Sequence, residues 1–182
     1  NGRPYTIGDM YQAADLVIDA TDLVVAPGFI DIHTHSDTPL LVQGEAHSHI
    51  RQGVTTNVIG NCGGSSAPMT DQQAEQISLQ QFDMPAGFAW DWRSLADYLA
   101  RLEGQGVSVN VVPLVGLGTA RGAVMGFEDR PASPGELELM KGIIRQAMAD
   151  GAFGVSSGLV YVPGSYASTD EIVALSRVAA AY

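Results

Sequence analysis

The chain of 182 residues is 46% hydrophobic and contains 21 glycines, which fits a folded, turn-rich globular protein and excludes a disordered one. Lys and Arg number 9 against 20 Asp and Glu, so the formal net charge of -11 disfavours nucleic acid and anionic membrane surfaces as partners. We find no apolar run near the roughly 18 residues of a membrane span and no basic-then-apolar signal segment. The single cysteine rules out an internal disulfide and suits a reducing compartment, so we expect a cytoplasmic location.

Residues 1–27 are expected to form part of a small β domain. Residues 14–19 and 23–26 resemble short extended pieces around a turn at residues 20–22, and Pro27 breaks the pattern. Because a pair of strands alone is marginal in water, this segment must lie against something larger, which we expect to be a β-sandwich. The chain also begins without a methionine and stops at Tyr182 inside an expected helix, so we expect a fragment of a longer protein.

Residues 28–35, Gly-Phe-Ile-Asp-Ile-His-Thr-His, predict a strand that ends in two histidines. Because strand side chains alternate between the two faces, Asp31, His33 and His35 are expected on one face and Ile30 and Ile32 on the other. The C-terminal ends of strands are where α/β folds place their chemistry, and paired imidazoles are ligands that zinc favours. Alternatively, two histidines near a turn merely cap a strand.

The rest of the chain alternates between expected strands and helices. Further strands are expected at residues 54–59, at 107–115 with a strand-end segment at 116–121, and at 152–156. The expected helices are a small one within residues 39–50, a weakly indicated one from Thr70, one capped by Asp91 and ended by Gly104, and two that follow capping boxes at Ser133 and Ser168.

Near-continuous apolar strands separated by amphipathic helices predict a parallel sheet covered by helices. Four such units are half of a (β/α)8 barrel. Because an open half barrel leaves an unpaired strand at each edge, we expect missing sequence or another chain to supply the remainder.

Cys62 follows the second expected strand and should lie beside the two histidines in a parallel sheet. A thiolate that joins two imidazoles is ordinary zinc chemistry, although a lone cysteine is more commonly a small buried apolar residue. The neighbouring Gly60 and Gly63 indicate an exposed turn and favour the ligand interpretation. His47 and His49 form a second His-x-His, but positions two apart on a helix do not share a face, so we expect both to face solvent.

Several motifs together resemble one known family. Residues 26–37, Ala-Pro-Gly-Phe-Ile-Asp-Ile-His-Thr-His-Ser-Asp, residues 51–56, Arg-Gln-Gly-Val-Thr-Thr, and residues 60–63, Gly-Asn-Cys-Gly, resemble the amidohydrolase superfamily and, within it, the N-acyl-D-amino-acid deacylases or D-aminoacylases. Because further segments between residues 109 and 167 also match, the resemblance covers most of the chain. It implies an α/β fold, a (β/α)8 TIM barrel of the metal-dependent hydrolase type, of which residues 28–182 are about the first half.

The resemblance also implies a set of site residues. His33 and His35 would bind one metal position, and Cys62 would bind the other position or both, with one or two zinc ions. Tyr161 would contact the carboxylate of the substrate, although a tyrosine that packs between strand and helix is an equal alternative from the sequence alone. The further metal-binding histidines and the proton-shuttling aspartate are expected beyond Tyr182.

Two departures from known patterns bear on this interpretation. Many amidohydrolases bridge two metals with a carboxylated lysine at the end of the fourth strand, but the only lysine here is Lys141 within an expected helix, so that subclass is disfavoured. Deacylases of the resembling family use the cysteine instead. They commonly carry a histidine where Leu117 stands, so a polar contact near the third strand is expected to be lost or altered.

The function that the resemblance implies is zinc-dependent hydrolysis of the amide bond of N-acyl-D-amino acids, small-molecule substrates that yield a carboxylate and a D-amino acid. Two alternatives stay open. One is hydrolysis of another C-N bond, such as a cyclic amide, and the other is a barrel with a decayed site that acts as a scaffold or binding module.

Overall fold

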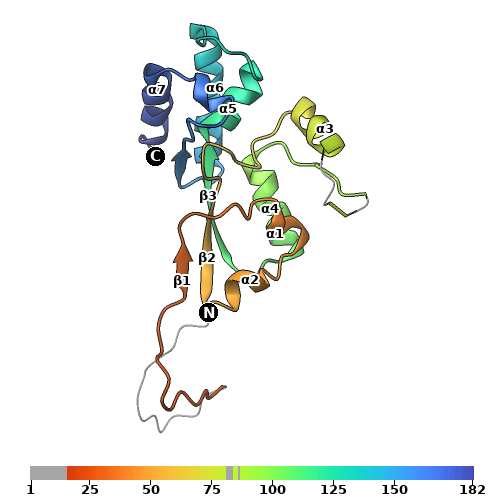
Figure 1. The fold of residues 1–182 in the computed structure, drawn as a ribbon, viewed down its shortest axis with the longest axis vertical. Coiled ribbons are helices and arrows are strands. Elements are labelled where there is room, and N and C mark those ends of the chain that lie inside the picture. The colour runs from red at the N-terminus through yellow and green to blue at the C-terminus, as the bar shows by residue number, and fades with distance from the viewer. Residues whose placement is uncertain (1–15, 81–83, 86) are drawn as a thin grey trace.

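The computed structural model describes residues 16–80, 84–85 and 87–182, and its centre is one parallel sheet. Its strands are β1 (Phe29–Asp31), β2 (Val54–Ile59), β3 (Asn110–Gly116) and β4 (Gly154–Ser156), in the spatial order β1-β2-β3-β4. Every neighbouring pair is parallel, with Ile30 opposite Thr56, Val58 opposite Val112 and Gly116 opposite Ser156. Figure 1 shows this sequential arrangement, which is the one expected for consecutive units of a (β/α)8 barrel.

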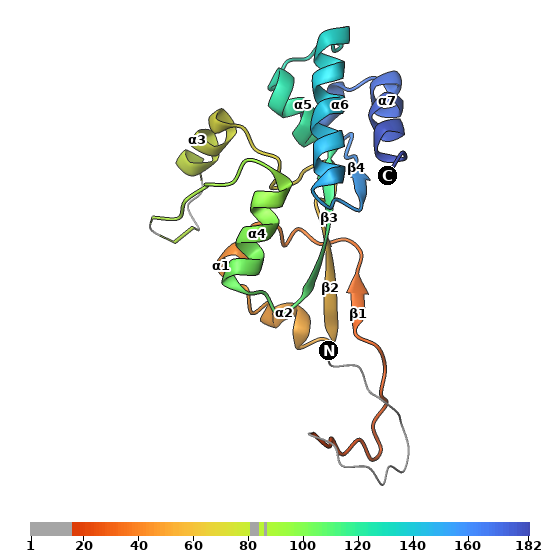
Figure 2. The same cartoon turned by 180° about the vertical axis from the view of Figure 1, so that it is seen from behind.

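The helices between the strands are α1 (Pro39–Val42), α2 (His47–Ile50), α3 (Asp71–Gln80), α4 (Leu95–Gln105), α5 (Leu117–Met125), α6 (Pro134–Ala149) and α7 (Thr169–Ala179), with a short 3-10 turn at Gly164–Tyr166. Helices α5, α6 and α7 pack on one another and gather near β3 and β4, whereas α1, α2 and α4 lie beside the other half of the sheet (Figures 1 and 2). Among the residues that the structure describes, no helix combines the length and apolar character needed to cross a membrane.

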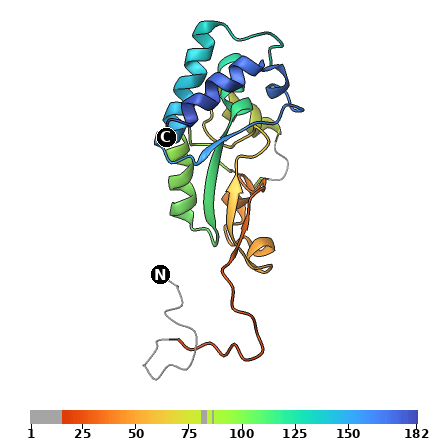
Figure 3. The same ribbon diagram turned by 90° about the vertical axis from the view of Figure 1, so that its left-hand side faces the viewer.

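Residues 16–27 contain no helix or strand and run away from the sheet (Figure 3). The expected turn is present, since the Leu23 amide donates to the Ala20 carbonyl at 3.0 Å and the Thr21 amide donates to Asp19 Oδ1 at 2.9 Å. The expected extended pieces do not pair, because no partner strand lies beside them in the described part, and residues 14 and 15 fall outside it. Whether residues 1–27 belong to a small β domain stays a prediction.

Two helix boundaries differ from the sequence-based expectation. Ser94, not Asp91, caps α4: its hydroxyl accepts from the Asp97 amide at 3.1 Å, while Asp97 Oδ2 accepts from the Ser94 amide at 3.0 Å. Asp91 pairs with Arg101 instead. Helix α4 continues through Gly104 to Gln105, and Gly106, with φ of +79°, supplies the left-handed conformation that ends it.

Helix α5 was not predicted from the sequence, which placed only a strand end at residues 116–121. It begins directly at the end of β3, with Gly116 as an N-cap that offers no side-chain oxygen, and it contains two glycines. Neither a capping residue nor strong helix propensity marks it in the sequence. Tertiary packing on α6 stabilises it instead.

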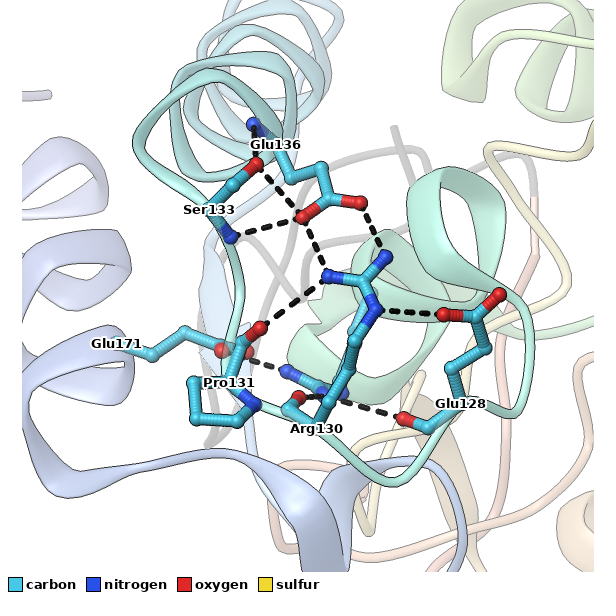
Figure 4. Close-up of polar contacts among 7 residues, drawn as sticks. Glu128, Arg130, Pro131, Ser133, Glu136 and Glu171 are labelled. Carbon is cyan, nitrogen blue, oxygen red and sulfur yellow. Dashed lines mark hydrogen bonds and ion pairs between the residues drawn. The ribbon is translucent and has the colours of Figure 1, made fainter.

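The capping box at Ser133 forms as predicted, and Glu136 also receives the Arg130 guanidinium at 2.6 and 2.8 Å (Figure 4). At Ser168 only half of the expected box is present. The Ser168 hydroxyl accepts from the Glu171 amide at 3.2 Å, but the Glu171 carboxylate turns to Arg121 of α5. Their ion pair is 2.6 Å long and almost fully buried, so it joins α5 to α7.

Candidate metal centre

Two histidines and the cysteine converge just beyond the C-terminal ends of β1 and β2. One ligand atom from each of His33, His35 and Cys62 lies within 4.8 Å of the others. His33 Nε2 is 3.2 Å from Cys62 Sγ, and the two imidazole rings are 5.5 Å apart at their centroids. Within the described residues, this is the one group of three or more His, Cys, Asp or Glu side chains with such geometry.

The two histidines lie beyond the strand that was expected to carry them. Strand β1 ends at Asp31, whose Oδ1 accepts from the His33 amide at 3.2 Å and turns the backbone out of the ladder. The two histidines nevertheless lie close together, since their ligand atoms are within 4.8 Å of each other, and Thr34 between them is buried. The expected burial of the opposite face is absent, because Ile30 and Ile32 are 62% and 75% exposed in the described chain, and the strand is shorter than predicted.

The histidine segment is fixed to the end of β2 through Thr34 and Asn61. The Thr34 amide and hydroxyl each donate to the Val58 carbonyl at 3.1 Å. The buried Asn61 amide group donates both to the Thr34 carbonyl at 3.1 Å and to the Val58 carbonyl at 2.8 Å. Because Thr34 stands between the two histidines, these bonds set their position relative to the next strand.

Cys62 is held in a backbone conformation that a non-glycine residue rarely adopts. Its φ is +56°, in the left-handed region, between Gly60 at +76° and Gly63 at +75°. Such a conformation costs a non-glycine residue about 1 kcal/mol or more, and it persists where the surrounding structure enforces it. It turns the half-buried thiol toward His33.

A cleft of about 630 Å³ opens beside the triad. His35 and Cys62 lie on its wall, and the other walls include Gln73, Phe127 and Tyr161. Tyr161 is 57% exposed and follows β4, so the structure brings it to the same cleft as the candidate ligands. An exposed tyrosine on the cleft wall fits a ligand contact better than it fits a packing tyrosine between strand and helix.

Among the residues that the structure describes, Asp37 is the one carboxylate on the cleft wall, two residues after His35. Burial raises the pKa of the Asp37 carboxyl, while hydrogen bonds from the backbone amides of Gly60 and Ser66 and the charge of His35 act in the opposite direction. The Tyr98 hydroxyl donates to the Asp37 carbonyl at 2.8 Å. Burial, and then the charge of Asp37, raises the pKa of Tyr98, so the phenol stays protonated as that donor.

The remaining sequence candidates lie apart from the triad. His47 and His49 are on the short helix α2, apart from the group of three ligand atoms; His47 is exposed, as expected, and His49 is half-buried. Leu117 begins α5 and is only 7% exposed, so it faces the core. Sequence reasoning assigned no role to Asp37, Gln73 or Phe127, and of these only Asp37, beside the His-x-His motif, carried a signal that could have suggested one.

Comparison with known proteins places these features in a family. An N-acyl-D-aspartate deacylase of Alcaligenes xylosoxydans xylosoxydans is 43% identical over 173 residues, which are 94% of this chain and 34% of that protein. A D-aminoacylase of the same organism is 41% identical over 181 residues, 99% of this chain and 37% of that protein. The chain thus spans about a third of the length of the curated relatives that it matches.

Solved structures agree with the sequence relatives. A D-aminoacylase structure described by its binuclear metal centre superposes with a TM-score of 0.73 at 38% identity, over 84% of this chain and 31% of that one. An N-acyl-D-glutamate deacylase from Bordetella bronchiseptica, complexed with zinc and a phosphonate inhibitor, gives 0.72 at 34% identity, over 85% and 32%. These matches confirm the predicted fold, about half of a metal-dependent hydrolase barrel, and the resemblance to D-aminoacylases. Together with a match of residues 16–181 to the model of the amidohydrolase family, they show that this chain belongs to that family.

Proposed function

We propose that the full-length protein is a zinc-dependent hydrolase that cleaves the amide bond of N-acyl-D-amino acids into a carboxylate and a D-amino acid. The observation that carries this proposal is the group of His33, His35 and Cys62 at the wall of an open cleft. The names of the relatives, an N-acyl-D-aspartate deacylase, a D-aminoacylase and an N-acyl-D-glutamate deacylase, support the substrate class.

The donor set fits zinc. Neutral imidazole nitrogen and thiolate sulfur are the ligands that zinc prefers, and two such donors on a tetrahedral ion are about 3.6 Å apart, given bonds of about 2.05 and 2.3 Å. The separation of 3.2 Å between His33 Nε2 and Cys62 Sγ is close to that value. The two exposed histidines also leave room for ligands from outside the chain, in keeping with the metal-binding histidines expected beyond Tyr182.

The chemistry divides between the metal and the chain. When bound, zinc supplies Lewis acidity toward the scissile carbonyl and a water whose pKa falls toward neutrality. His33, His35 and Cys62 hold the ion, and Tyr161 on the cleft wall offers a hydroxyl to the carboxylate of the substrate. Phe127 and Val162 give the same cleft an apolar part of its wall. The aspartate expected beyond Tyr182 would carry a proton from the attacking water to the leaving nitrogen.

The test measures metal and activity together in the full-length protein. We expect about one or two zinc ions per chain by elemental analysis and hydrolysis of N-acetyl-D-amino acids in preference to their L enantiomers. His35→Ala and Cys62→Ala should each lower the zinc content, whereas His47→Ala, an exposed histidine outside the triad, should retain it. Activity on L substrates or cyclic amides alone would refute the substrate assignment. A wild-type protein without metal would refute the zinc centre and leave a scaffold role.

A further inference from the structure

The loop of residues 60–66, here called the Cys62 loop, follows β2 but extends sideways past the end of that strand. It crosses the end of β3 and reaches β4 at the edge of the sheet. Gly116 at the end of β3 makes the crossing possible, because a Cβ at that position would lie 2.3 Å from the Gly63 carbonyl oxygen. Thr119 of α5 donates its amide to the same carbonyl at 3.1 Å.

One hydroxyl on β4 holds both ends of the turn that contains Cys62. The Gly63 amide donates to Ser156 Oγ at 3.0 Å, and Ser156 Oγ donates in turn to the Gly60 carbonyl. The donor and an acceptor site of a single side chain therefore close a bridge across residues 60–63. Ser156 is half-buried, which limits competition from water for these two bonds.

The residue two positions further along fixes the other side of the turn. A Cβ at Gly158 would lie 2.0 Å from the Cys62 carbonyl oxygen, a distance that no side chain tolerates, and 3.0 Å from Cys62 Cα. The backbone after β4 thus touches the backbone of Cys62 directly. Because Cys62 is itself in the left-handed region, contacts of this kind are what keep it there.

We propose that Ser156 is a positioning residue of the metal centre: it binds no metal and no substrate, but holds the Cys62 turn so that the thiol faces His33. The inference deepens the proposed function, on which the metal centre rests. In this proposal, the end of β4 orients Cys62, a metal ligand from the loop that follows β2. Partners that orient metal ligands in this way typically account for about 10- to 100-fold in metal affinity.

The experiment uses the full-length protein with four variants in two matched pairs and a fifth variant as a rescue. Ser156→Ala removes both bonds of the bridge, and Ser157→Ala removes an exposed neighbouring hydroxyl. Gly158→Ala pushes a methyl group into the Cys62 backbone, and Gly64→Ala adds one that meets only the Asn61 carbonyl oxygen at 3.8 Å. Ser156→Thr keeps the hydroxyl and should rescue the loss.

Two readouts separate positioning from general stability. Zinc affinity is measured by competition with a chelator, and the alkylation rate of Cys62 in the metal-free protein is followed by mass spectrometry of its peptide. We expect Ser156→Ala and Gly158→Ala to weaken zinc binding by about 10- to 100-fold and to speed alkylation several-fold, with Ser157→Ala, Gly64→Ala and Ser156→Thr close to wild type.

Equal values for Ser156→Ala and Ser157→Ala in both readouts would overturn the proposal. If circular dichroism shows that Ser156→Ala is unfolded, the comparison of Gly158→Ala with Gly64→Ala decides in the same way. A wild-type protein that binds no zinc would refute the proposed function alone, since the alkylation rates still report whether β4 positions Cys62.

Discussion

The buried ion pair between α5 and α7 gives the sharpest prediction for stability. Arg121 Nη1 lies 2.6 Å from Glu171 Oε2, and the two side chains are 0% and 5% exposed. Arg121 Nη2 also donates to the Arg130 carbonyl at 2.6 Å, while its buried Nε has no partner among the described residues. The guanidinium is thus completely removed from water, and within the described part of the chain Glu171 is the one carboxylate paired with it.

Replacing Glu171 with alanine leaves the charge of Arg121 buried and uncompensated. Breaking a buried pair in this way costs about 3–5 kcal/mol. The matched control is Glu138→Ala on α6, which removes the partner of Lys141 in a pair with exposed fractions of 61% and 22%. An exposed pair contributes little to stability, so we expect Glu138→Ala to be close to wild type and nearly the whole cost of Glu171→Ala to separate the two variants.

Urea denaturation of the full-length protein, followed by circular dichroism, measures both free energies of unfolding. The double substitution Arg121→Met and Glu171→Leu removes both charges and should recover most of the loss, because apolar pairs of similar volume replace buried ion pairs at little cost. If Glu171→Ala is no less stable than Glu138→Ala, the argument from burial is wrong.

Two further predictions concern α6. The hydrogen bond from Arg130, followed by those from Ser133, holds the pKa of Glu136 well below its ordinary value, so the carboxylate contributes stability above about pH 4.3 that is lost as the pH falls. The difference in Tm between wild type and Glu136→Gln should therefore shrink between pH 6 and pH 3. A constant difference would contradict the assignment. Ile144 is 0% exposed, so Ile144→Ala should lower the free energy of unfolding, measured in urea, by about 2–5 kcal/mol. Leu139→Ala, at a position 62% exposed on the same helix, should change it by no more than about 0.5 kcal/mol. Similar losses in the two variants would contradict the placement of the core.

The features that the sequence predicted well are those that local patterns encode. Residues 54–59 form β2 with the expected bounds because a run of β-branched residues strongly favours a strand over other secondary structures. The Ser133 box forms because its partners lie three residues apart. The cap expected at Asp91 is wrong: Ser94 caps α4, and Asp91 pairs instead with Arg101 of that helix.

The features that the sequence did not predict depend on contacts between residues far apart in the chain, and local sequence patterns do not show such contacts. The motif at Ser168 predicted that Glu171 would turn back to its own helix N-terminus, but a buried guanidinium from α5 attracts its carboxylate more strongly than an exposed backbone amide does. Helix α5 has little local signal of its own and depends on that contact and on α6. Helix α5 could therefore be predicted only if the tertiary contacts around it were already known.

The candidate metal centre combines both kinds of information. The residue types, two histidines one residue apart and a cysteine between glycines, could be identified from the sequence because ligand chemistry restricts which side chains serve. The position of the thiol could not, because the left-handed backbone at Cys62 depends on a hydroxyl 93 residues from Gly63 and 96 residues from Gly60. A serine at the end of the fourth strand carries no motif. Its role follows only when the Cys62 loop is seen to cross β3, which in turn requires a glycine at position 116.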